Sequence, residues 1–136
     1  MSILGTRAGL IADLAIIVQA AAFIILVSGV IYIKKKNYQR HVKLADIAVF
    51  FGMLSFLWMG FSLMNNFQAL ISNISASRNL ITIIHIITGL IVLITGISFA
   101  ANRYIKKFQN NMRMAFLLWA FALFLGFILY IIYYTY

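Results

Sequence analysis

Few residues of this sequence are able to carry chemistry, and they are scattered through long apolar stretches. The 136 residues include two carboxylates, Asp13 and Asp46, two histidines, His41 and His85, and no cysteine. An ionisable side chain inside a bilayer costs about 2.5 to 3.5 kcal/mol on insertion scales, so such a residue is a functional candidate by default. Asp13 and His85 are the two that lie well inside apolar runs.

Asp13 and His85 lie at similar depths from the same end of their apolar runs. We therefore expect them to form a polar pair within the membrane. In one interpretation the pair is a buried hydrogen bond that fixes the register of two helices. In the other it is functional, because a carboxylate often orients a histidine that binds a metal or haem. Both interpretations remain open at this point.

The sequence offers a candidate for a metal or cofactor site. His41 and His85 lie toward opposite ends of the predicted spans, so they cannot share one haem iron. Met59 and Met64 lie toward the same face as His85, and thioethers are soft ligands that suit copper(I). We expect no cofactor of the chain's own, with His85 as the candidate cofactor-binding residue if haem or copper arrives through a partner.

The composition is that of a membrane protein. Hydrophobic residues make up 65% of the chain and charged residues 10%, and the mean hydropathy is +1.03. Four apolar stretches, at about 8–33, 44–64, 80–101 and 114–134, are each long enough to cross about 30 Å of hydrocarbon as a helix. Their short polar connections predict an all-α, up-down-up-down four-helix transmembrane bundle that forms one domain, 1–136.

Basic residues indicate how the bundle is oriented. Only Arg7 and Arg78 lie on the side of the termini. By the positive-inside rule, we expect the first and third loops in the cytoplasm, both termini outside, and a multi-pass location in the cell membrane. Because the positive charge flanks the spans, it predicts contact with membrane lipids and not with nucleic acid. The basic residues of the two loops are Lys34, Lys35, Lys36, Arg40, Lys43, Arg103, Lys106, Lys107 and Arg113.

Small residues and a possible internal repeat indicate how the helices pack. The segment 25–30 resembles 92–97, and each is followed by a basic loop and a tryptophan-containing span. This favours a repeat of two hairpins, although apolar hairpins also resemble one another by chance. Small residues mark close helix contacts in membranes. We expect Ser28 and Gly29 to meet Thr95 and Gly96 between the first and third helices, with the packing extended by Gly52, Gly60, Gly89 and Gly126.

An ordered series of short motifs resembles a known family. The series is Arg40-His41, Ile84-His85-Ile86, Thr95-Gly96-Ile97, and Trp119 with Gly126 and Tyr130. It is similar to a family of small four-helix membrane proteins of long-unknown function that includes a haem-copper oxidase maturation factor of Gram-positive bacteria. Only His41 and His85 match that family's histidines, because the third loop reads Lys106-Lys107-Phe108-Gln109. The resemblance implies an accessory place beside an oxidase.

Three functions are consistent with these features. We expect an accessory or assembly subunit of a larger membrane oxidase, of the haem-copper or copper monooxygenase kind, whose partners are lipids and larger membrane subunits. No phosphate loop, catalytic triad or paired carboxylate is present, so we predict no catalytic residue and no enzyme activity. The alternative is a redox or metal-handling protein that uses His85. A small transporter is third, because the chain has no proline to break its helices.

Overall fold

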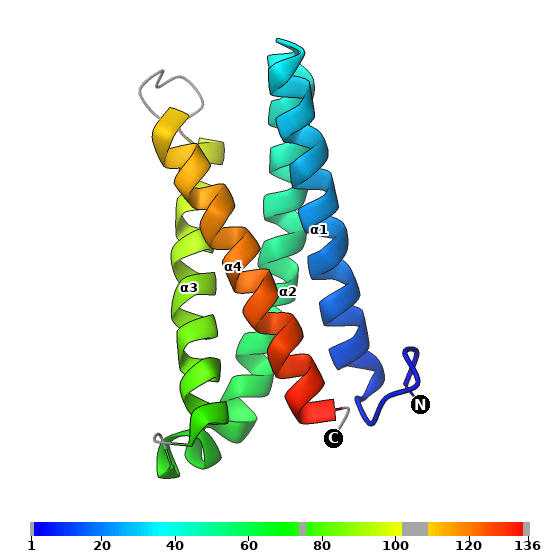
Figure 1. Ribbon diagram of the computed structural model, residues 1–136, viewed down its shortest axis with the longest axis vertical. Helices are drawn as coiled ribbons and strands as arrows, with labels where there is room; N and C mark the ends of the chain where they lie inside the picture. Colours follow the sequence, from blue (N-terminus) through cyan, green and yellow to red (C-terminus); the bar gives the residue numbers. More distant parts are fainter. Residues whose placement is uncertain (1, 74–75, 102–108, 135–136) are drawn as a thin grey trace.

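The computed structural model describes residues 2–73, 76–101 and 109–134, and these form four α-helices (Figure 1). The helices are α1 (Leu10–Lys34), α2 (Tyr38–Ser72), α3 (Ser77–Ala101) and α4 (Gln109–Tyr134). Each is long and apolar enough to cross a membrane. The predicted all-helical architecture with four spans is confirmed, and it indicates a multi-pass membrane protein.

α2 differs most from its predicted bounds. It contains 35 residues and continues to Ser72, through most of the segment that the hydropathy pattern leaves as a loop. The apolar pattern ends near Met64 because asparagine and glutamine follow, but these residues do not stop the helix. At the other end, the Asn37 side chain caps α2 by accepting a hydrogen bond from the Arg40 amide at 3.2 Å.

The helices contact one another in chain order around the bundle. α1 packs on α2, α2 on α3, α3 on α4 and α4 on α1, with the most extensive contacts inside the hairpins α1–α2 and α3–α4. The termini and the α2–α3 connection lie at one end of the bundle, and the α1–α2 turn lies at the other (Figure 1). In the described part of the chain α1 and α3 are diagonal and do not approach each other. The predicted packing of α1 against α3 is therefore wrong.

Four of the predicted glycines lie at helix contacts, although their neighbours differ from the predicted ones. A methyl group added at Gly29 would lie 3.5 Å from Leu44, and one at Gly96 would lie 3.1 Å from Val49, so both glycines face α2. Gly52 and Gly126 have contacts as close, with Trp119 and His85 respectively.

The other small residues do not pack as predicted. A methyl group added at Gly60 or Gly89 would meet nothing within 4 Å, so these two glycines are not at helix contacts. The hydroxyls of Ser28 and Thr95 donate to carbonyls of their own helices, Ile24 and Ile91. A sequence shows that a residue is small, but not which side of an apolar helix faces a neighbour.

Few of the described side chains are buried between the helices, and the outer surface is apolar. Ala22, Ala48, Val92 and Trp119 form the buried cluster of the core. Large apolar side chains are exposed on every helix, for example Ile24, Leu57, Ile94 and Phe124. This surface fits a hydrocarbon environment, in which exposed apolar side chains carry no penalty.

The described basic residues of the two predicted loops lie at or next to helix ends. Arg40 and Lys43 belong to the first turns of α2, and Arg113 belongs to the start of α4, so these three are helical. They are exposed, as are Lys34, Lys35 and Lys36 at the end of α1. Arg103, Lys106 and Lys107 lie outside the described residues.

Candidate binding cavity

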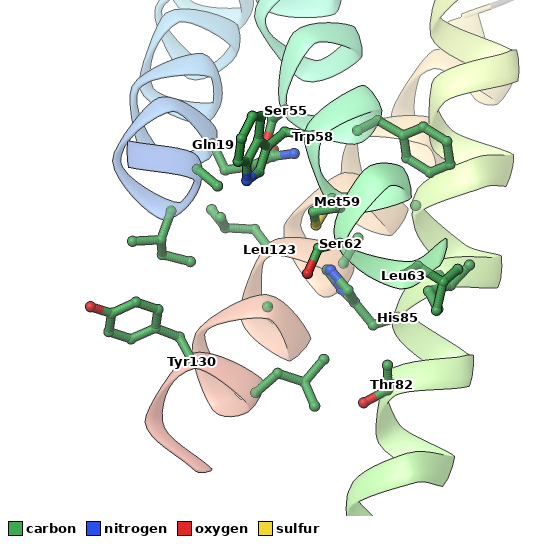
Figure 2. Close-up of a pocket in the computed structure, with 18 of the residues that line it drawn as sticks. Gln19, Ser55, Trp58, Met59, Ser62, Leu63, Thr82, His85, Leu123 and Tyr130 are labelled. Carbon is green, nitrogen blue, oxygen red and sulfur yellow. The ribbon is translucent and has the colours of Figure 1, made fainter. Parts of the chain in front are cut away.

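Polar side chains from all four helices face one cavity inside the bundle. Its volume is about 520 Å³ and its walls are mainly apolar (Figure 2). Small-molecule sites in proteins are commonly of this kind, with a volume of roughly 300 to 1,000 Å³ and a few placed polar groups. The polar lining includes Gln19, Ser55, Ser62, Thr82, His85 and Tyr130.

α2 supplies one wall of the cavity through the regular spacing of its residues. Ser55, Met59 and Ser62 are four and three positions apart, so their side chains project from the same face of the helix. Figure 2 shows the three along α2, with Gln19 of α1 beside Ser55. Gly52 continues this face toward Trp119.

His85 extends from α3 into the cavity toward Met59 and Ser62 (Figure 2). The ring lies against Gly126, where an added methyl group would be 3.2 Å from Cε1. The ring nitrogen Nδ1 is buried and has no hydrogen-bond partner in the described structure.

Ser55 is a second unsatisfied group on the same cavity. The residue is only 3% exposed, and its Oγ makes no hydrogen bond to the described residues. Serine in a helix commonly donates to a carbonyl of the preceding turn, as Ser28 and Ser98 do. Buried polar atoms usually have partners, so the Ser55 hydroxyl is an exception among the described residues.

Asp13 does not pair with His85. Its Oδ2 accepts hydrogen bonds from Ser2 Oγ at 2.7 Å and from the amides of Ile3 and Leu4 at 2.6 and 3.0 Å. The Tyr130 hydroxyl donates to Oδ1. The carboxylate is fully buried by these contacts. The predicted Asp13–His85 pair is therefore wrong.

Depth and position explain why the pair does not form. Asp13 lies in the first turn of α1, whereas His85 lies about two turns inside α3 because that helix begins at Ser77. α1 and α3 are also diagonal in the bundle. The prediction of equal depth depends on where the two helices begin. In the structure α1 begins at Leu10 and α3 at Ser77, which differ from the predicted starts.

Asp13 instead holds the N-terminal segment on the end of the bundle. Thr6 Oγ1 lies 2.8 Å from the Tyr130 hydroxyl, and the Arg7 amide donates to the Tyr134 carbonyl at 3.0 Å. Residues 2–9 thereby join the start of α1 to the end of α4. Sequence reasoning missed this arrangement because the segment has no periodic pattern.

The proposed copper ligands are only partly brought together. Met59 and His85 line the same cavity and also a smaller one of about 40 Å³. Met64 is 80% exposed and lines neither, so it does not belong with them. Among the described residues, no three histidine, aspartate or glutamate side chains are close enough to hold a metal ion.

His41 does not line the cavity and serves a different contact. Its Nδ1 lies 3.0 Å from the Gly29 carbonyl oxygen, which links α2 to α1 near their connecting turn. The sequence showed this histidine among basic residues and gave no sign of the contact.

The chain matches no family model, no curated protein and no solved structure. Its function is therefore inferred from its own residues and their geometry.

Proposed function

We propose that this chain is an accessory or assembly subunit of a larger membrane oxidase, of the haem-copper or copper monooxygenase kind. The exposed end of α2 supports a role beside a partner. The kind of partner rests on the resemblance carried by Arg40-His41, Ile84-His85-Ile86 and the motifs that follow them. In this proposal the basic turn between α1 and α2 faces the cytoplasm and both termini lie outside.

The observation that carries the proposal is the length of α2. Its 35 residues span about 52 Å, whereas the 25 residues of α1 or α3 span about 38 Å. The hydrocarbon core of a bilayer is only about 30 Å thick. The last turns of α2 meet the start of α3, where the Asn79 side chain donates to the Leu70 carbonyl at 3.3 Å. From Met64 to Ser72 only Leu70 is buried, so most of this end is exposed.

The exposed end of α2 has a surface suited to packing against another protein. Met64, Phe67 and Ile71 are 80%, 52% and 47% exposed. Their spacing of three and four residues places them side by side on one face. Aromatic residues and methionine are enriched where protein interfaces form. A larger membrane subunit that covers this face removes these side chains from the interfacial region.

Cysteine crosslinking tests the partner contact directly. The chain has no cysteine, so a single Phe67→Cys substitution gives one reactive site. We expect it to crosslink to a larger membrane subunit in native membranes, with oxidase subunits identified by mass spectrometry. Phe50→Cys is the matched control, because Phe50 is on the same helix and is 58% exposed. Absence of any crosslinked partner, together with migration as a lone chain in mild detergents, would refute the accessory role.

A further inference from the structure

The cavity runs lengthwise along α3, with a charged residue at one end and apolar residues at the other. The lining residues of α3 recur every three or four positions and so share one face of the helix; among them are Arg78, Thr82, His85, Gly89, Val92 and Gly96. From the first to the last of these the helix rises about 27 Å. A cavity of about 520 Å³ that extends this far is long and narrow.

We propose that this cavity binds an amphipathic anion with a single long hydrocarbon chain. The charged group of the ligand lies at Arg78, and its chain lies along α3 toward Gly96. The site is a property of this chain and does not depend on the identity of a partner subunit.

The polar end of the cavity is accessible to a ligand. Ser62, Asn66 and Arg78 line this end, and all three residues are exposed. Figure 2 shows Thr82 toward the same end, below His85 and Ser55. Since Arg78 belongs to the first turn of α3, this opening lies at the end of the bundle that holds the α2–α3 connection (Figure 1).

Arg78 gives the opening a positive charge that the chain itself does not neutralise. It is the one Lys, Arg, Asp or Glu among the lining residues. Of the chain's two aspartates, Asp13 accepts from Tyr130 and the N-terminal segment, and Asp46 lies near the other end of α2. The guanidinium carbon of Arg78 lies over the Tyr133 ring, 5.0 Å from its centroid. This contact uses the face of the guanidinium and leaves N–H groups at its edge for an anion.

The deeper walls determine the rest of the ligand. Beyond His85 the walls are mainly apolar and include Phe56, Val92, Leu93 and Trp119. Apolar cavities do not hold water readily, whereas each methylene group buried there is favourable. The volume lies within the range of small-molecule sites, which suits one hydrocarbon chain and not the two chains of a bilayer phospholipid. A metal ion or a compact ring would fill only part of so long a cavity.

Two kinds of molecule supply this chemistry. A fatty acid carries a carboxylate, and a lysophospholipid carries a phosphate. The arginine fork binds either group with two hydrogen bonds. Both therefore enter the test, and the one that binds more tightly identifies the source of the ligand.

Quenching of Trp119 by a brominated chain tests the proposal on the full protein in nonionic micelles. Trp119 lines the cavity and is 9% exposed, so bromine in the surrounding micelle does not reach it. Trp58 is 40% exposed and is replaced by phenylalanine in all samples. Along α3, Arg78 is about 21 Å from Val92, which packs with Trp119, so the bromine is placed at the end of a hexadecyl chain.

The same brominated chain is titrated as a carboxylate, as lysophosphatidylglycerol and as an alcohol, at mildly alkaline pH. We expect at least one anion to reach half-maximal quenching at about one fifth of the alcohol concentration, the effect of one exposed ion pair. Arg78→Gln should remove this preference. Arg7→Gln is the matched control and should keep it, because Arg7 lies at the same end of the bundle and does not line the cavity.

A second variant blocks the apolar part of the cavity. Gly89 lines the cavity, and a methyl group added there meets nothing within 4 Å, so Gly89→Leu should fold and abolish quenching by every ligand. Gly60→Leu is its control, because Gly60 has the same free space but does not line this cavity. Equal quenching by the anions and the alcohol, a preference that survives Arg78→Gln, unchanged quenching in Gly89→Leu, or no quenching at all would each overturn the proposal.

Discussion

The Tyr130 hydroxyl donates a hydrogen bond to the buried Asp13 carboxylate and thereby joins the end of α4 to the start of α1. The two helices make fewer contacts with each other than α1 makes with α2. A charged acceptor strengthens a hydrogen bond relative to a neutral pair. This contact therefore contributes strongly to holding the two hairpins together at the end where the termini lie.

Tyr130→Phe should destabilise the bundle more than the same change at Tyr133. Tyr130 loses its hydrogen bond to a charged group, which should lower the folding equilibrium constant about tenfold. The Tyr133 hydroxyl is exposed and lies 3.4 Å from Thr82 Oγ1, so Tyr133→Phe should have little effect. Reversible unfolding in mixed micelles measures both. Equal effects of the two substitutions would mean that the Tyr130–Asp13 hydrogen bond adds no more stability than the Tyr133 contact.

Asp13 and His85 should behave as independent sites. The structure places them on diagonal helices with different partners, so the effects of Asp13→Leu and His85→Leu on folding should multiply to within about a factor of two. The measurement is a double-mutant cycle in the same unfolding assay. Asp13→Asn with Tyr130→Phe is the positive control and should show clear coupling. Strong coupling between Asp13 and His85 would contradict the observed pairing.

Gly96→Ala should destabilise the protein, whereas Gly89→Ala on the same helix should not. The new methyl group at Gly96 would lie 3.1 Å from Val49 Cγ2, and β-branched valine has little freedom to rotate within a helix. Overpacking of this kind costs about 1 to 3 kcal/mol. At Gly89 the methyl group meets nothing within 4 Å, and alanine gains about 0.5 to 1 kcal/mol in a helix interior. The free energy of unfolding, measured for each variant, shows whether the substitution stabilises or destabilises the protein.

The proposed orientation predicts which end of α2 is accessible from outside the cell. Ser72 and Gln39 are both exposed and lie at opposite ends of this helix. In intact cells an impermeant thiol reagent should label Ser72→Cys and leave Gln39→Cys unlabelled, and permeabilised cells should show labelling of both. The reverse pattern would invert the topology. The chain has no native cysteine to add background.

The sequence by itself determined the number and approximate places of the four spans. Long apolar runs in lipid must satisfy their backbone hydrogen bonds internally, which leaves the helix as the form of each span. The apolar pattern predicted the ends of the helices less accurately. α2 continues past Met64 through polar residues such as Asn66, whose side chain donates to the Ser62 carbonyl at 2.9 Å.

Only the tertiary structure decided which residues meet. A helix that is apolar on all sides has no polar face to show which side is turned inward, so the sequence could not show that Gly29 and Gly96 both face α2. The sequence identified Asp13 and His85 as polar groups that are unfavourable inside a membrane, but the prediction that they pair was wrong. The order of the helices around the bundle places Asp13 beside Tyr130 and His85 at the cavity. Side-chain contacts depend on the position and rotation of each helix as well as on depth.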